Sequence, residues 1–415
     1  MHRKNIELLA PVGSIEAMAA AAKGGANAVY FGAGSLNMRS ASSSGFSIEH
    51  IAELTSRARD SGMRSYLTLN VVLFDDDQDE LERILDAAAQ AGVDAIIASD
   101  IAVMEASRKR GLPVHISTQA NIANTSALAF FAAYADTVVL ARELSLQRIK
   151  VISDAIKAQA ILGPSGHPVR IEVFAHGALC MAVSGHCYMS LHTHGLSANR
   201  GRCVQVCRRS YELADKDDNE DANLRLAGPY ILSPKDLCTL PFLDRMLSAG
   251  VSVLKIEGRA RPPEYVLAVT RAYNTALTAI ADGSYDSDFA KNLEDSLKTS
   301  FNRGFWAGHY LGSTIPELSG NYGSASPVRK RFVGTVSNYY AKPGVAEFLA
   351  ENNGLVEGQA VLFVGPTTGV VEAVAAGMLA DEQPSAQPAK GSRVTMRVPE
   401  TVRRGDKVYT LEPRL

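Results

Sequence analysis

The feature that most constrains the fold is a repeated unit in which the end of a helix runs through a short apolar stretch into small or polar residues. Four clear copies are GGANAVYFGAG, AGVDAIIASD, AYADTVVLARE and AGVSVLKIEGR. Amphipathic stretches with apolar residues at spacings of three and four separate these copies, as in helices that pack one face against a sheet. Alternation of this kind is typical of a parallel β-sheet covered by helices.

The number of apolar runs favours one of two architectures in this class. Eight strands are predicted before residue 260, which is the number that a (β/α)8 barrel requires. A doubly wound open sheet more often has about five to seven strands, and it remains the alternative. We therefore expect an α/β protein with a TIM-like (β/α)8 barrel. The predicted strands are 6–9, 28–31, 65–69, 95–98, 114–117, 137–140, 169–174 and 253–256, and the predicted helices between them include 14–23, 48–61, 78–91 and 145–158.

The chain changes character after the predicted barrel. Helical patterns continue through 263–281 and 287–303, and alternating β-type runs follow, namely FVGTVSNYY, GQAVLFVG, SRVTMRV and DKVYTLE. We expect a catalytic barrel domain at 1–326 and a small all-β, barrel-like domain at 327–415. A loop rich in Pro, Ala and Gln at 381–390 is predicted to be mobile.

Composition excludes several classes of protein. Hydrophobic residues make up 46% of the 415 residues and charged residues 21%, as in an ordinary globular protein. No run of 18 apolar residues occurs, and the N-terminus lacks the pattern of a signal peptide. We expect a cytoplasmic protein that does not span a membrane. The formal net charge of −2 indicates that any contact with nucleic acid is local.

All five cysteines fall within 59 residues of the chain, a clustering that scattered structural cysteines would not show. Disulfides are disfavoured in a reducing compartment, so metal binding or catalysis is the better interpretation. Four of them have the spacing Cys-x6-Cys-x15-Cys-x3-Cys, in a predicted insertion at 175–225 that follows a late strand of the barrel. Zinc sites usually present C-x2-C pairs, which are absent here, so the spacing favours an iron–sulfur cluster, with zinc or reduced core cysteines as alternatives. The candidate metal ligands are Cys180, Cys187, Cys203 and Cys207, and Cys238, placed at the start of a helix, is the reserve ligand.

Polar side chains follow five of the predicted strands at the point where each strand ends. In a parallel barrel these ends converge on one face, where substrates bind. His176 stands four residues before Cys180 and is the first catalytic candidate among them. A strand-end Asn or Ser also often caps the following helix, and Glu257 could simply pair with Lys255 or Arg259. The residues are Asn70, Ser117, Thr118, Gln119, Asn121, Arg142, Glu143, His176, Lys255, Glu257 and Arg259.

Arginines gather around the cysteines, and a second basic group lies at the predicted domain junction. Such groups are more often a solvated face. Beside a redox centre, however, they are where a phosphate backbone or a dicarboxylate would bind. An acidic loop at 215–221 is the structural alternative, because it could pair with the first group. The first group is Arg200, Arg202, Arg208 and Arg209, the second is Arg329, Lys330 and Arg331, and the neighbouring Tyr339 and Tyr340 could stack on bases or fill the small barrel.

Four segments together resemble the collagenase-like peptidase family U32, namely EVFAHGALC-x6-C, NRGRC-x3-CRR, LSPKDL and LKIEGR. The similarity covers nearly the whole chain, from ELLAPVGSIEAMAAAAKGGANAVYFG to the terminal β-domain. The resemblance implies a 4Fe-4S cluster whose first three ligands map onto Cys180, Cys187 and Cys203. The C-x3-C pattern implies Cys207 as the fourth ligand, although some members take it from farther along the chain, which keeps Cys238 as an alternative.

The family name records an early proteolytic assignment, whereas its better-understood members are oxygen-independent hydroxylases. They act on the wobble uridine of transfer RNA, on a cytidine of large-subunit ribosomal RNA, or in ubiquinone synthesis, and the RNA-directed ones depend on prephenate. The resemblance therefore implies prephenate-dependent 5-hydroxylation of the wobble uridine of transfer RNA, with the β-domain helping to hold RNA. The catalytic candidates are His176, Glu257, Lys255, Arg259, Gln119 and Asn70, and the binding candidates are Arg200, Arg208, Arg142 and Ser117.

Other functions remain open at this point. Proteolysis is the first alternative, but the chain has neither an H-E-x-x-H helix nor a G-x-S-x-G elbow. Hydroxylation of a ribosomal RNA cytidine or of a quinone precursor is the second. The third is a noncatalytic RNA-binding or cluster-carrying partner, because some family members work as heterodimers.

Overall fold

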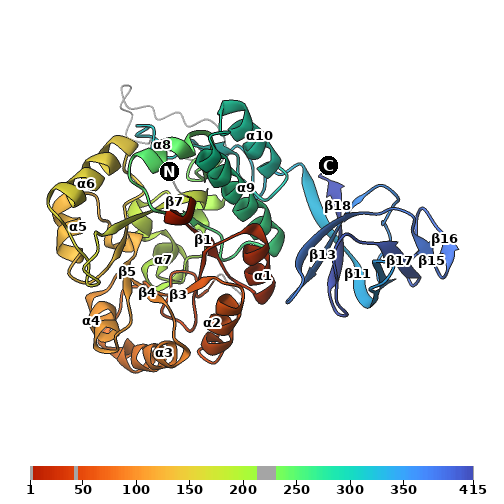
Figure 1. The fold of residues 1–415 in the computed structure, drawn as a ribbon, viewed down its shortest axis with the longest axis horizontal. Coiled ribbons are helices and arrows are strands. Elements are labelled where there is room, and N and C mark those ends of the chain that lie inside the picture. Colours follow the sequence, from red (N-terminus) through yellow and green to blue (C-terminus); the bar gives the residue numbers. More distant parts are fainter. Residues whose placement is uncertain (1–2, 42–44, 213–229, 415) are drawn as a thin grey trace.

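The computed structural model of the protein describes residues 3–41, 45–212 and 230–414. It contains an α/β barrel and a smaller all-β unit that lies beside it (Figure 1). The acidic loop at 215–221, which the sequence offers as a partner for the nearby arginines, lies outside the described residues. Within the described ranges, no helix combines the length and the apolar content needed to cross a membrane.

Eight parallel strands close a barrel, as the number of apolar runs predicts. Each strand pairs with the next along the chain from β1 to β7, and β9 then pairs with both β7 and β1. The closed ladder confirms the barrel and shows that the open-sheet alternative is wrong. The strands are β1 (Glu7–Pro11), β2 (Ala28–Phe31), β3 (Arg64–Leu69), β4 (Ala95–Ala98), β5 (Val114–Ile116), β6 (Thr137–Val139), β7 (Arg170–Ala178) and β9 (Val253–Ile256).

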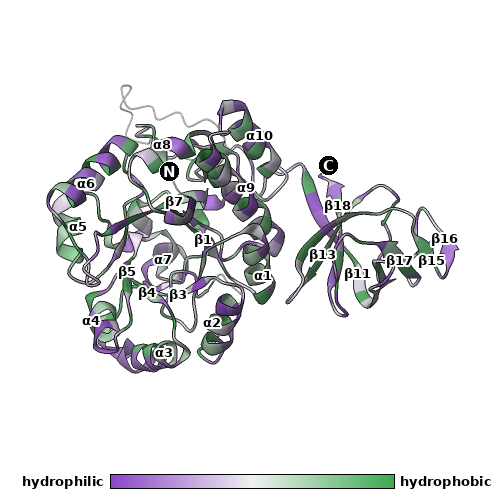
Figure 2. Ribbon diagram, viewed as in Figure 1, coloured by the Kyte–Doolittle hydropathy of each residue, from purple (hydrophilic) through white to green (hydrophobic). Residues whose placement is uncertain are grey.

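Helices cover the outside of the barrel, with polar faces toward solvent and apolar faces toward the strands (Figure 2). Ser14 starts the first of them, because its hydroxyl accepts a hydrogen bond from a backbone N–H of the first turn. The helix predicted at 287–303 ends already at Leu297, since the side-chain amide of Asn302 donates to two carbonyls of the preceding turn. The helices are α1 (Ile15–Gly24), α2 (His50–Asp60), α3 (Gln78–Ala91), α4 (Ile101–Lys109), α5 (Thr125–Phe131), α6 (Leu146–Ala158), α8 (Leu243–Ser248), α9 (Pro263–Asp282) and α10 (Ser287–Leu297).

The interior of the barrel is charged as well as apolar. Branched apolar side chains dominate the interior layers of most such barrels. Here Glu7 accepts a hydrogen bond from the hydroxyl of Tyr66 at 2.7 Å and pairs with Arg170 at 3.0 Å and with Arg64. Charges buried this deeply persist only when they are paired, so the interior is a connected polar network. Its buried polar members are Glu7, Tyr66, His115, Glu172 and Lys255.

The predicted insertion follows β7 and covers the mouth of the barrel formed by the carboxyl ends of the strands. In its described part, up to residue 212, it contains the short helix α7 (Met189–His194) and three 3-10 turns, and the chain returns through β8 (Asp236–Cys238), to which β10 (Phe305–Trp306) adds. The expectation that Cys238 begins a helix is wrong. Cys238 lies in β8, which pairs antiparallel with the end of β7 that extends beyond the barrel and satisfies its backbone groups.

The C-terminal unit is an antiparallel sheet of eight strands with its own apolar core, as predicted. Among the described residues no pairing joins its edge strands β14 and β16, so the sheet is barrel-like but not closed. It packs beside α1 and α9, with ion pairs such as Lys23 with Glu400 at 2.8 Å (Figure 1). The mobility predicted for 381–390 stays a prediction, although the loop includes β16. The strands are β11 (Val328–Tyr340), β12 (Val345–Ala350), β13 (Ala360–Gly365), β14 (Gly369–Val374), β15 (Leu379–Ala380), β16 (Gln383–Pro384), β17 (Arg393–Arg397) and β18 (Lys407–Pro413).

Candidate functional site

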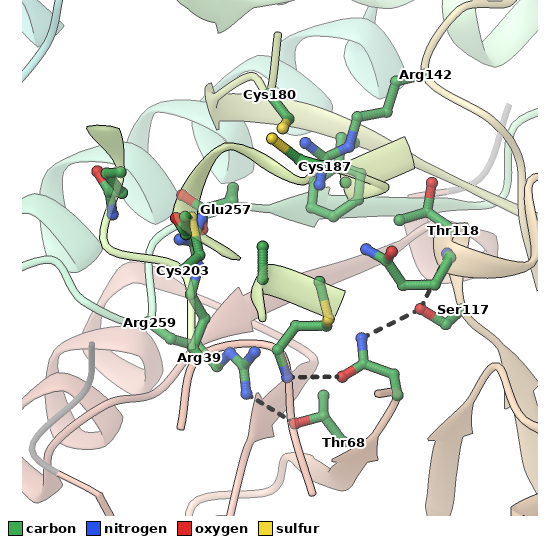
Figure 3. Close-up of a pocket in the computed structure, with 18 of the residues that line it drawn as sticks. Arg39, Thr68, Ser117, Thr118, Arg142, Cys180, Cys187, Cys203, Glu257 and Arg259 are labelled. Carbon is green, nitrogen blue, oxygen red and sulfur yellow. Dashed lines mark hydrogen bonds and ion pairs between the residues drawn. The ribbon is translucent and has the colours of Figure 1, made fainter. Parts of the chain in front are cut away.

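A cavity of about 130 Å³ lies between the mouth of the barrel and the insertion. Its floor consists of strand ends, and all four candidate cysteine ligands line it. Figure 3 labels three of them, Cys180, Cys187 and Cys203. Eight of the eleven polar residues predicted at strand ends line it. These are Asn70, Ser117, Thr118, Gln119, Arg142, Lys255, Glu257 and Arg259.

Cys187 is held by backbone hydrogen bonds on both sides. Its sulfur accepts a hydrogen bond from the backbone N–H of Met189 at 3.4 Å, at the start of α7. Its own N–H donates to the side-chain oxygen of Asn199 at 3.3 Å. These bonds fix the direction in which the sulfur points before any ligand is bound.

Cys203 is held by a neighbouring hydroxyl. The hydroxyl of Ser190 lies 4.0 Å from the sulfur of Cys203 as a donor, and its oxygen accepts from the N–H of Val204 at 3.2 Å. Ser190 thus ties α7 to the segment that carries Cys203. Cys180 is exposed and follows β7 directly, whereas Cys187, Cys203 and Cys207 are half-buried.

The four thiols lie close enough to affect one another's charge. Burial raises the pKa of the Cys207 thiol, the guanidinium of Arg208 lowers it, and the thiolates of Cys180, Cys203 and Cys187 each raise it further. In the parts of the chain that the structure describes, no three His, Cys, Asp or Glu side chains are spaced to hold a single metal ion. Four thiols on one cavity are donors of the kind that an iron–sulfur cluster takes, and zinc accepts thiolates as well.

An ion pair joins the cavity wall to the cysteine roof. Arg39 donates to the carboxylate of Glu257 at 2.9 Å. Burial acts to raise the pKa of Glu257, but Arg39 and further guanidiniums outweigh it and hold that pKa below its usual range. The thiolate of Cys203 also stabilises the charge of Arg39, whose pKa is raised mainly by Glu257. Arg39 is therefore paired with the carboxylate and lies near enough to Cys203 to feel its charge.

Two further arginines are fixed in the cavity. Arg259 donates to the hydroxyl of Thr68 at 2.7 Å and to the side-chain oxygen of Asn37 at 3.0 Å, and burial lowers its pKa to about 10. Arg142 stacks over the ring of Phe174 at 4.1 Å, and its buried Nε makes no hydrogen bond in the structure. Planar guanidiniums in fixed positions suit the recognition of carboxylate or phosphate.

Amide and hydroxyl groups occupy the opposite wall. Asn70 donates to the hydroxyl of Ser117 at 3.2 Å and accepts from the backbone N–H of Met38 at 3.2 Å (Figure 3). Ser117 also caps a short 3-10 turn by accepting from the N–H of Gln119 at 3.3 Å. The capping role that the sequence offers for strand-end serines is thus real here, although Ser117 lines the cavity as well.

Three of the predicted catalytic and binding residues do not line this cavity. His176 points outward, because a bulge between Phe174 and His176 interrupts the alternation of β7 and turns its ring against Tyr265 and Tyr273 of α9. Burial lowers its pKa to about 3, so it is a neutral core histidine. The other two are Arg200 and Arg208, and Asn121 and Glu143 are likewise absent from the lining.

The arginines near the cysteines have different roles. Arg200 makes a two-pronged ion pair with Asp77, at 2.7 and 3.0 Å. Arg208 is largely buried and donates to the carbonyl of Pro234 at 2.7 Å and to that of Leu179. Only Arg202 and Arg209 of this group are exposed to solvent.

The basic group at the domain junction is largely paired. Lys330 pairs with Glu264 of α9 at 2.8 Å, and Arg331 pairs with Glu412 at 2.8 Å. Tyr339 packs against the core of the terminal sheet, whereas Tyr340 is 44% exposed. Lys330 therefore joins the two units, whereas Arg331 pairs within the terminal sheet.

Several site residues have no signal in the sequence pattern. Arg39 follows β2 by eight residues, outside the positions where a strand end is expected. Glu172 lies within the apolar run of β7, so it is counted as part of a strand. A lone carboxylate inside an apolar strand needs a buried cation, and that requirement could have pointed to the pair of Glu172 with Lys255.

These features define a (β/α)8-barrel protein whose site lies at the carboxyl ends of the strands under a cysteine-bearing insertion. The chain belongs to peptidase family U32, whose model matches residues 13–319. It is 46% identical over 414 residues to a protein named collagenase of Porphyromonas gingivalis, covering 100% of each chain.

Other relatives are named for RNA hydroxylation. The chain is 32% identical to tRNA hydroxylation protein P1 of Bacillus subtilis, over 88% of this chain and 84% of that one. It is 36% identical to the 23S rRNA 5-hydroxycytidine synthase of Escherichia coli, over 72% of this chain and 44% of that one. The family thus includes proteins named for two activities, RNA hydroxylation and proteolysis.

Proposed function

We propose that the protein is an iron–sulfur-dependent RNA nucleobase hydroxylase that acts on the wobble uridine of transfer RNA, with prephenate as co-substrate. The observation that carries this proposal is the convergence of four cysteines with fixed cations and amides on one cavity at the barrel mouth. The relatives named for hydroxylation of transfer RNA and ribosomal RNA support the choice of an RNA substrate.

Cys180, Cys187, Cys203 and Cys207 would hold the cluster, which supplies one-electron chemistry when it is bound. The chain's own part is to orient these sulfurs. The backbone N–H of Met189 and the hydroxyl of Ser190 point at two of them, and hydrogen bonds of this kind set the reduction potential of a thiolate-bound centre.

The cavity offers separate groups to an anion and to a base. Arg142 is placed to bind a carboxylate of a small co-substrate such as prephenate. Asn70 and Gln119 present amides that can bond the edge of a nucleobase. A cavity of about 130 Å³ is too small for a folded RNA, so the base must be extruded from its stack to reach it.

Proteolysis is the second candidate, because the protein named collagenase is 46% identical to this chain. A cysteine nucleophile needs a base within hydrogen-bond reach. Among the described residues, no histidine lines the cavity with the cysteines. The site therefore favours hydroxylation over hydrolysis.

Nucleoside mass spectrometry of RNA from a deletion strain tests the proposal. We expect loss of 5-hydroxyuridine-derived nucleosides from transfer RNA, restored by the wild-type chain and by a Cys238→Ser variant but not by Cys203→Ser. A deletion strain whose hydroxylated nucleosides are unchanged would overturn the proposal. Loss of a hydroxylated cytidine from ribosomal RNA instead would keep the reaction and change its substrate.

A further inference from the structure

Lys255 lies at the floor of the cavity with its ammonium group buried. It comes from the middle of β9, and its side chain is 6% exposed. Its Nζ lies 2.7 Å from an oxygen of Glu172, 4.6 Å from the centre of the Tyr30 ring and 5.7 Å from that of Phe174. The amine is thus out of bulk water and reachable only from the cavity.

We propose that Lys255 is a nucleophile that forms an imine with the keto carbon of a small 2-oxo acid bound in this cavity. Lysine is suited to this chemistry when it is desolvated or lies near other cations. Prephenate carries a 2-oxo acid side chain, so the inference deepens the proposed function and rests on it for the identity of the natural ligand.

Glu172 is placed to take the proton that must leave Lys255 before attack. Burial raises the pKa of Glu172 and lowers that of Lys255, and Arg259 and Arg142 lower the latter further. A raised pKa of Glu172 and a lowered pKa of Lys255 both favour moving the proton from the amine to the carboxylate. Transfer of one proton across the 2.7 Å contact then converts a buried ion pair into a neutral pair.

A second observation points to the same proton site. The other carboxylate oxygen of Glu172 and the Nδ1 of His115 are both buried without a hydrogen bond, and they lie 3.8 Å apart. Burial lowers the pKa of His115 to about 3, so the ring is neutral and can accept a hydrogen bond. At 3.8 Å the two atoms are not hydrogen-bonded, and a protonated Glu172 would donate to the ring after a small approach, which would satisfy both groups.

The step balances without an oxidant or reductant. Lys255 gives one proton to Glu172, its lone pair forms a bond to the keto carbon, and the carbonyl oxygen takes the proton back from Glu172. Loss of that oxygen as water, with a second proton supplied by the new ammonium group, leaves the imine. Arg142 lies in the same cavity with an unpaired Nε and is placed to hold the adjacent carboxylate.

Reductive trapping tests the proposal without RNA and without the cluster. The metal-free protein is incubated with pyruvate and cyanoborohydride, digested, and analysed by peptide mass spectrometry. We expect one reduced pyruvate adduct, on Lys255, and roughly hundredfold slower trapping in Glu172→Gln, the lower range for loss of a general base.

Lys235 provides the matched control, because it also forms a 2.7 Å pair with a glutamate, Glu317, but at the surface. Lys235→Arg should trap as the wild type does, and Lys255→Arg should not trap at all. Should Lys255→Arg fail to fold, the peptide map of the wild-type protein still shows which lysine carries the adduct. No adduct, or adducts only on surface lysines, overturns the proposal and leaves hydroxylation itself untouched.

Discussion

Replacing Arg200 with Ala is expected to loosen the cysteine-bearing insertion without unfolding the barrel. The guanidinium joins the insertion to the loop after β3 through Asp77, at 2.7 and 3.0 Å, and through the carbonyl of Val72 at 3.1 Å. It also stacks over the ring of Phe74 at 4.0 Å. Arg200 follows Asn199, which holds the backbone of Cys187, so the contact positions a candidate ligand.

The free energy that Arg200→Ala removes from the closed insertion follows from these contacts. A half-buried, two-pronged ion pair, a hydrogen bond to a carbonyl and a cation–π contact together contribute about 2 kcal/mol once exchange with water is considered. All of them act between the insertion and one loop, so the local opening equilibrium should shift by roughly 30-fold. The unfolding of the barrel should change little.

Hydrogen–deuterium exchange of the metal-free protein measures this opening directly. Amides of 186–203 should exchange roughly 30-fold faster in Arg200→Ala, while those of the barrel strands keep their rates. Arg202→Ala, which removes an exposed neighbouring arginine, is the control and should change neither. Unchanged exchange in 186–203 together with a lower melting temperature would refute the reasoning.

The stabilisation that the Arg200–Asp77 pair gives to the insertion should also depend on pH. The hydrogen bond from Arg200 lowers the pKa of Asp77. A carboxyl group with a depressed pKa stabilises the folded form above its unfolded value of about 3.9, and this stabilisation is lost as pH falls through the folded value. The exchange difference between wild type and Arg200→Ala should therefore be full at neutral pH and shrink in acid.

Three further outcomes are expected. Cys187→Ser should lose cluster iron in a metal assay after anaerobic reconstitution, whereas Cys238→Ser, outside the cavity, should keep it. Arg208→Glu should lower the melting temperature strongly, because a carboxylate would replace a part-buried donor to carbonyls. Arg209 is exposed, so Arg209→Glu should leave the melting temperature unchanged and weaken RNA binding in a titration. Glu257→Gln should cost about 1 to 3 kcal/mol in denaturant unfolding by leaving the half-buried Arg39 without this carboxylate, and this loss should fade as pH falls through the depressed pKa of Glu257.

Local sequence pattern was enough for the barrel and for part of its site. Each apolar run forms a strand, and parallel strands bring their ends together, so Asn70, Ser117 and Lys255 meet as predicted. His176 does not, because the bulge in β7 changes which face it points to. Nothing in the local pattern marks such a bulge before the pairing with β9 is known.

Long-range partners explain the remaining misses. Arg200 was expected to bind an anion, but its carboxylate stands 123 residues earlier in the chain, at Asp77. Glu172 pairs with Lys255, 83 residues away. Spacing along a chain gives the chemistry of a group, whereas only the closed barrel determines which charges face one another.

The charges around the cavity depend on the roof that covers it. Arg39 is bound by Glu257 and is also stabilised by the thiolate of Cys203. Four thiolates brought together on one cavity would repel one another, and fixed guanidiniums near them reduce that repulsion. An insertion that opens, as expected for Arg200→Ala, admits water and weakens each of these interactions at once. The contact between Arg200 and Asp77 therefore supports the electrostatics of a cavity whose lining includes neither residue.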